Sequence, residues 1–154
     1  MSDFAKRQAT QIRNAEEQRA EARKLADTES AAFAERESIK RKLAPDLWNA
    51  LKEMIVSKCS EVNKELGKDH YRCHDELPNK LQVIRLNPAA NLRLEFFPDG
   101  NRIHFNAGHC VGDYLIELDD NTEQAILSNA YHQAFEVEST AEHLLEVCLE
   151  KAPF

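Results

Sequence analysis

The feature that most constrains the fold is the absence of glycine and proline from the first 44 residues of this 154-residue chain. These residues are mainly Ala, Glu, Gln, Arg and Lys, which have high intrinsic helix propensities. Opposite charges recur at helical spacing, for example Glu37 with Arg41. The pattern predicts one long charged helix over residues 3–43.

Large apolar residues are sparse on this predicted helix. Their stripe is too thin for a helix that faces a core and too interrupted for a regular coiled coil. Two interpretations stay open: a solvated helix, and a helix that dimerises or binds a partner. We favour the second, because an isolated polar helix has no need of large exposed apolar side chains. The candidate contact residues are Phe4, Ile12, Leu25, Phe33 and Ile39.

A second amphipathic segment begins at Pro45. Proline suits the first turn of a helix, and Asp46 beside it complements the helix dipole. Apolar residues then repeat every three or four positions as far as Leu66, and Gly67 supplies a C-terminal cap. The spacing predicts a helix over residues 46–66. Whether the first helix continues through Pro45 stays open.

After a polar loop over residues 67–79, the apolar period changes from helical to two. Six runs have the composition of strands: LQVIRL, LRLEFF, RIHF, DYLIEL, EQAIL and HQAFEV. The sequence Pro98-Asp99-Gly100-Asn101 predicts a hairpin turn, because proline sets the first corner and glycine accepts positive φ. Short connections throughout predict an antiparallel meander of five or six strands.

The chain ends in another amphipathic helix. Ser139 has the position of an N-cap, with Glu142 three residues later as a capping box requires. Its predicted buried stripe is Ala141, Leu144, Leu145, Cys148 and Ala152. We therefore expect an α+β fold: a long charged helix over residues 1–44 projecting from the core, and an α+β domain over residues 45–154. In that domain a helix, the β-meander and a C-terminal helix form a two-layer sandwich.

The net charge of −7 is concentrated near the C-terminus, where the residues from Asp113 onward include ten acids and one base. Glu142, Glu146 and Glu150 follow one another at four-residue spacing on one face of the last helix. This face is either a solvated surface that favours solubility or a binding edge for a basic protein.

The sequence carries none of the standard catalytic signatures: no phosphate-binding glycine loop, no nucleophile elbow, no HExxH and no CxxC. It therefore indicates binding rather than catalysis. One cluster contains zinc-type ligands: His70, Cys73, His74, His109 and Cys110. The alternatives for this cluster are a polar surface loop and a Cys–His nucleophile built on Cys73 or Cys110. No other cofactor is indicated.

The remaining sequence features concern the compartment and the partners. The N-terminus lacks the apolar segment of a signal peptide, and no run is long enough to span a bilayer, which predicts a cytoplasmic protein without a membrane partner. The cysteines are then expected to be reduced, with Cys59 and Cys148 as small core residues. Acids interleave with the bases of residues 1–44, which argues against nucleic-acid binding.

Three functional hypotheses follow from these features. The first and leading hypothesis is an interaction protein, a homodimer or adaptor that uses the N-terminal helix, the acidic C-terminal surface, or both. The second is an acidic chaperone or toxin-neutralising module, and the third is a zinc-dependent protein that uses the His/Cys loops.

Overall fold

The fold is known from a computed structural model, which describes residues 2–151 and contains two compact units that meet between Ser38 and Ile39. Helix α1 (Asp3–Leu66) contains Pro45 in its interior, so the helix continues through the proline. Proline removes one backbone hydrogen bond from a helix. Here Ala44 and Trp48 on either side are 1% exposed, and their packing holds the helical path.

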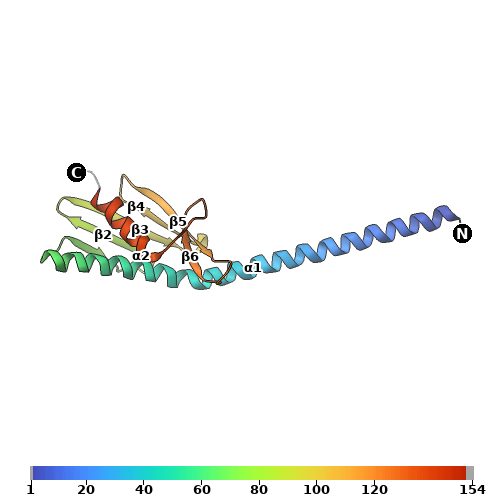
Figure 1. The fold of residues 1–154 in the computed structure, drawn as a ribbon, viewed down its shortest axis with the longest axis horizontal. Helices are drawn as coiled ribbons and strands as arrows, with labels where there is room; N and C mark the ends of the chain where they lie inside the picture. Colours follow the sequence, from blue (N-terminus) through green and yellow to red (C-terminus); the bar gives the residue numbers. More distant parts are fainter. Residues whose placement is uncertain (1, 152–154) are drawn as a thin grey trace. The chain divides into compact units, whose positions relative to one another are not determined.

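The unit that begins at Ile39 contains a seven-stranded antiparallel sheet in which each strand pairs with the next along the chain (Figure 1). The predicted meander is therefore confirmed, with seven strands instead of five or six. The strands are β1 (Tyr71–His74), β2 (Lys80–Leu86), β3 (Ala89–Phe97), β4 (Arg102–Asn106), β5 (Val111–Leu118), β6 (Ala125–Ser128) and β7 (Ala134–Phe135).

The additional strand is β1, which lies inside the segment predicted to be a polar loop. Its buried and half-buried residues, Tyr71 and Cys73, alternate with exposed Arg72 and His74. Its register places Cys73 opposite Val83 of β2. The strand was missed because its two apolar positions lie between charged residues and histidines, so the segment has the composition of a polar loop.

The turn between β3 and β4 is confirmed as a short 3₁₀ turn, η1 (Pro98–Gly100). The residue with positive φ is Asn101 at +46°, one position after the expected glycine. Asparagine tolerates this conformation better than other non-glycine residues, so the turn needs no glycine there.

The C-terminal helix consists of α2 (Val137–His143) and a π-helical continuation, η2 (Leu144–Glu150). The predicted capping box is wrong: the N-cap is Glu136, with no side-chain hydrogen bond, and Ser139 lies within the helix. The predicted buried stripe is confirmed from Ala141 to Cys148. Ala152 lies outside the described residues.

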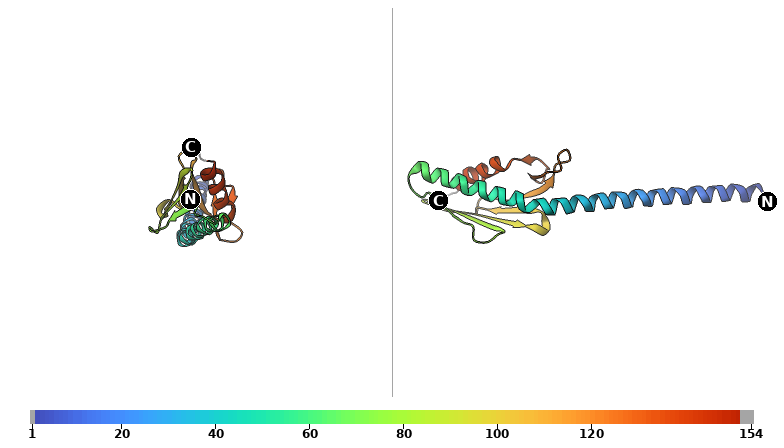
Figure 2. Two further views of the ribbon diagram at one scale, coloured as in Figure 1. Left: turned by 90° about the vertical axis from the view of Figure 1, so that its left-hand side faces the viewer. Right: turned by 90° about the horizontal axis from the view of Figure 1, so that it is seen from below.

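One face of the sheet is buried against α1 and the C-terminal helix, which gives the expected two-layer α+β arrangement (Figure 2). Trp48 of α1 stacks on Phe96 of β3 with ring centroids 5.9 Å apart, and its indole nitrogen donates to the Pro78 carbonyl at 2.8 Å. The opposite face of the sheet carries polar residues that alternate with the buried ones.

Close packing at one strand pair depends on glycine. Gly112 of β5 lies opposite Phe105 of β4. A Cβ added at Gly112 would stand 2.8 Å from the Phe105 ring, which is itself packed on Tyr114 with centroids 5.1 Å apart. An added methyl group must therefore displace the Phe105 ring, which already contacts Tyr114.

We expect Gly112→Ala to destabilise the protein by about 1–3 kcal/mol through overpacking. Urea unfolding monitored by circular dichroism measures this. Gly100→Ala is the matched control, because the atoms nearest to an added Cβ there belong to the Arg102 side chain and lie at 3.5 Å or more, which is ordinary van der Waals contact. Equal stability of the two variants would contradict the account.

Candidate functional site

A buried arginine holds the end of the C-terminal helix. Arg85 lies on the core face of β2 and is 1% exposed. Its Nη1 donates to the carbonyls of Leu149 at 2.8 Å and Glu150 at 2.6 Å, and its Nε donates to Pro88 at 2.7 Å. The guanidinium thus satisfies carbonyls that a helix end leaves without partners.

The Glu150 side chain collects donors from the start of β1. The His70 imidazole lies 2.8 Å from Glu150 Oε1, and the Tyr71 hydroxyl donates to the same oxygen. Burial raises the pKa of Glu150, but the hydrogen bonds from Tyr71 and His70 outweigh it and hold the pKa below its usual value. Burial, and then the bond to Glu150, raise the pKa of Tyr71, so the phenol stays a donor.

Two further contacts fix α1 beside these elements. The Asn63 side chain accepts from the backbone N–H groups of His70 and Tyr71 and donates to the Tyr71 carbonyl. Lys58 pairs with Glu138 at 2.9 Å and with Glu142 at 3.3 Å. Hydrogen bonds to these two carboxylates raise the pKa of Lys58.

These contacts enclose a groove of about 480 Å³ between the end of α1 and the C-terminal helix. We call it the acidic groove. It is lined by Lys58, Glu61, Val62, Leu66, His70, Tyr71, Glu142, Leu145, Glu146 and Glu150. Val62 is 36% exposed and Leu66 is 52% exposed, so apolar side chains are accessible in the groove. Four carboxylates surround them.

The carboxylates of the groove differ in how they are paired. Glu142 is paired with Lys58, and Glu150 is held by His70 and Tyr71. Glu61 and Glu146 are exposed, and neither side chain has a hydrogen bond or ion pair within residues 2–151. The three glutamates predicted as a binding edge therefore line one groove, and Glu146 is the one whose charge stays available.

The predicted metal ligands occupy several separate environments. His70 contacts Glu150, His74 lines a hollow on the polar face of the sheet, and His109 lines a second hollow there. Within residues 2–151, no three His, Cys, Asp or Glu side chains form a group that could hold a metal ion. The zinc site stays a prediction.

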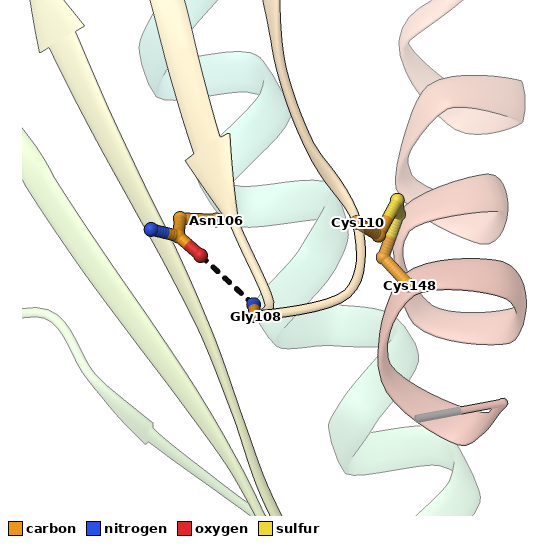
Figure 3. The surroundings of a disulfide bond; sticks show 4 residues. All are labelled: Asn106, Gly108, Cys110 and Cys148. Atoms are coloured by element: carbon orange, nitrogen blue, oxygen red, sulfur yellow. Dashed lines mark hydrogen bonds between the residues drawn. A yellow bond between two sulfur atoms is a disulfide. The ribbon is translucent and has the colours of Figure 1, made fainter. Parts of the chain in front are cut away.

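The structure corrects the expectation of four reduced thiols. Cys110, in the loop between β4 and β5, forms a disulfide with Cys148 of η2, with Cα atoms 5.4 Å apart (Figure 3). A disulfide sulfur offers no thiolate to a metal, so this bond removes Cys110 from the predicted ligand set. Cys148 is also a core residue, as predicted.

The other two cysteines are free and share a hydrogen bond. Cys59 is buried on the core face of α1, as predicted. The hydrogen bond to Cys73, and then burial, raise the pKa of Cys59. The same bond lowers the pKa of Cys73, although burial opposes it.

The predicted contact residues of the N-terminal helix lie on α1. Four of them, Phe4, Ile12, Leu25 and Phe33, are between 56% and 67% exposed. Ile39 is half-buried. Their role as a contact surface stays a prediction.

The sequence prediction missed Arg85, Tyr71 and Lys58. Arg85 had a detectable signal, because it occupies the same alternating phase as Leu81 and Val83 in a strand, where a charge needs buried partners. Tyr71 was missed because it lies in β1, the strand that was predicted to be a polar loop. The ion pairs of Lys58 with Glu138 and Glu142 form only because the C-terminal helix lies beside α1, and the sequence does not show that contact.

Comparison with known protein families, curated proteins and solved structures gives no match. None of the helices within residues 2–151 combines the length and the apolar content that crossing a membrane requires.

Replacing Glu150 by Gln tests the cluster at the groove. A carboxyl whose pKa is lowered by folding stabilises the folded state above its ordinary pKa, and this contribution is lost as the pH falls through the folded value. We expect wild type to be more stable than E150Q at neutral pH and the difference to shrink below about pH 4.5. Urea unfolding at a series of pH values measures the difference.

The control is Glu123→Gln, which removes an exposed turn carboxylate that receives no hydrogen bond from Tyr71 or His70. If the free energies of unfolding of E150Q and E123Q changed with pH in the same way, the donors around Glu150 would have no effect on stability, and the account of this cluster would be contradicted.

Proposed function

We propose that this chain is a protein-interaction module whose acidic groove binds a basic, partly apolar helical segment. The observation that carries the proposal is the combination of two exposed apolar side chains, Val62 and Leu66, with the unpaired carboxylates of Glu61 and Glu146. Apolar side chains supply affinity when they are covered, and the surrounding charges select the sign of the partner.

The occupant that fits this groove is the N-terminal segment of a second copy of the chain. Residues 4–15 are helical and contain three bases, Lys6, Arg7 and Arg13, and no acid. The segment also presents exposed Phe4 and Ile12. Its charge is therefore opposite to that of the groove.

The lengths of the two surfaces also agree. Phe4 and Ile12 are eight residues apart, which is about 12 Å along a helix. Lys58 and Leu66, at the two ends of the groove wall on α1, have the same separation in sequence and hence the same spacing. A helix laid along α1 would bring both apolar side chains to the groove.

This proposal joins the two surfaces predicted from the sequence, the N-terminal helix and the acidic C-terminal face, in one homotypic contact. An acidic chaperone or toxin-neutralising module would use the same groove for a basic helix of another protein.

A cytoplasmic location stays a prediction. The disulfide between Cys110 and Cys148 argues against it, because cytosolic thiols are kept reduced.

Replacing both unpaired glutamates, as E61Q/E146Q, tests the proposal. We expect the full-length protein to self-associate in sedimentation velocity, and the double variant to associate about three- to tenfold more weakly, as the loss of two solvent-exposed charge contacts implies. The salt dependence of association should also decrease, because fewer charges are paired on binding.

The matched control is E123Q/E136Q, which removes two exposed glutamates of the same unit that do not line the groove. Equal weakening by both double variants would show that net charge, and not the groove, governs association. A protein that stays monomeric at all concentrations would exclude the second copy as occupant and leave a basic helix of another protein.

A further inference from the structure

The polar face of the sheet, opposite the helices, holds a group of hydrogen-bond donors that the acidic groove does not use. Arg93 and Asn91 are exposed on β3, where they alternate with buried Leu92 and Leu94. The sheet register places Arg93 between Gln82 of β2 and Asn106 of β4.

Two hollows on this face meet at Arg93 and Asn106. The first has a volume of about 520 Å³ and contains charges of both signs, including the Lys80–Glu95 pair at 3.5 Å. The second has a volume of about 360 Å³. It is lined by Ala89, Ala90, Asn91, Arg93, Asn106, Ala107, Gly108 and His109.

The second hollow contains no carboxylate, and Arg93 is its one residue that is always charged. The Arg93 guanidinium has no hydrogen bond or ion pair within the described part of the chain, residues 2–151. A guanidinium presents several N–H donors in a fixed plane and matches the geometry of carboxylate and phosphate oxygens.

The two asparagines are oriented as donors by their own hydrogen bonds. Gln82 Nε2 donates to Asn91 Oδ1 at 2.7 Å, and the Gly108 backbone N–H donates to Asn106 Oδ1 at 2.8 Å. Figure 3 shows the Asn106 oxygen turned toward Gly108 and its amide nitrogen on the other side. Because both oxygens are engaged, the amide N–H groups remain for a ligand.

The wall of the hollow is made of small residues. Ala89, Ala90 and Ala107 have only methyl side chains, and Gly108 has none. Gly108 has φ of +85°, a conformation that favours glycine and that brings its N–H to Asn106. A ligand can therefore approach the donors closely without meeting a long side chain.

We propose that this hollow is a binding site for a small oxyanion, the phosphate or carboxylate group of a small molecule. Arg93 supplies the charge, and Asn91 and Asn106 supply neutral donors. The absence of any carboxylate in the lining allows the anion to bind without like-charge repulsion. The mixed charges of the first hollow make it the weaker candidate for the anionic group, and it would instead receive the remainder of a larger ligand.

Titration of the full-length protein with inorganic phosphate, and separately with acetate, tests the site. We expect saturable changes in the NMR signals of the Asn91 and Asn106 side-chain amides and the Arg93 Nε–H. The tighter of the two anions identifies the group that the site selects. Arg93→Gln should weaken binding about tenfold or more, as the loss of a charge-assisted hydrogen bond implies.

The matched control is Arg72→Gln, which removes an exposed arginine two strands away on β1, outside both hollows. It should bind with unchanged affinity. The proposal would be overturned if neither anion gave saturable changes, or if R72Q weakened binding as much as R93Q.

Discussion

The arrangement of the folded unit depends on one buried charge. Arg85 lies among apolar residues on the core face of β2, and a buried guanidinium is costly unless its donors are satisfied. Its partners include the carbonyls at the end of the C-terminal helix, the Pro88 carbonyl and, at 3.8 Å, the Glu150 carboxylate. The helix must therefore end at one place on the sheet, beside β1 and the last turns of α1. The acidic groove is a consequence of that placement.

Each layer of the fold then presents a surface of its own. On the helix side, Lys58 neutralises part of the acidic charge, while Glu61 and Glu146 keep theirs beside exposed apolar groups. On the other side of the sheet, the second hollow contains the donors Asn91, Arg93 and Asn106, and no carboxylate lines it. A single chain of net charge −7 thus has an acidic surface, for which we propose a basic protein segment, and a separate surface of donors, for which we propose a small anion.

The amino-acid sequence predicts the elements better than it predicts their ends and contacts. The change of period after Gly67 locates six of the seven strands, because each lies in an apolar run of the sequence, including the short β6 and β7 in EQAIL and HQAFEV. It misses β1, where only Tyr71 and Cys73 mark the buried phase between charges. Glu142, Glu146 and Glu150 were found from their spacing, but the pairing of Glu142 with Lys58 and of Glu150 with Tyr71 depends on contacts between residues about 80 positions apart.

The most direct measurement of the central claim is an NMR titration of the full-length protein with a synthetic peptide of residues 4–15. We expect the peptide to shift the methyl signals of Val62, Leu66 and Leu145 in the acidic groove, and binding to weaken as salt is added. A peptide that leaves these methyl signals unchanged, or that shifts only signals elsewhere in the protein, would contradict it.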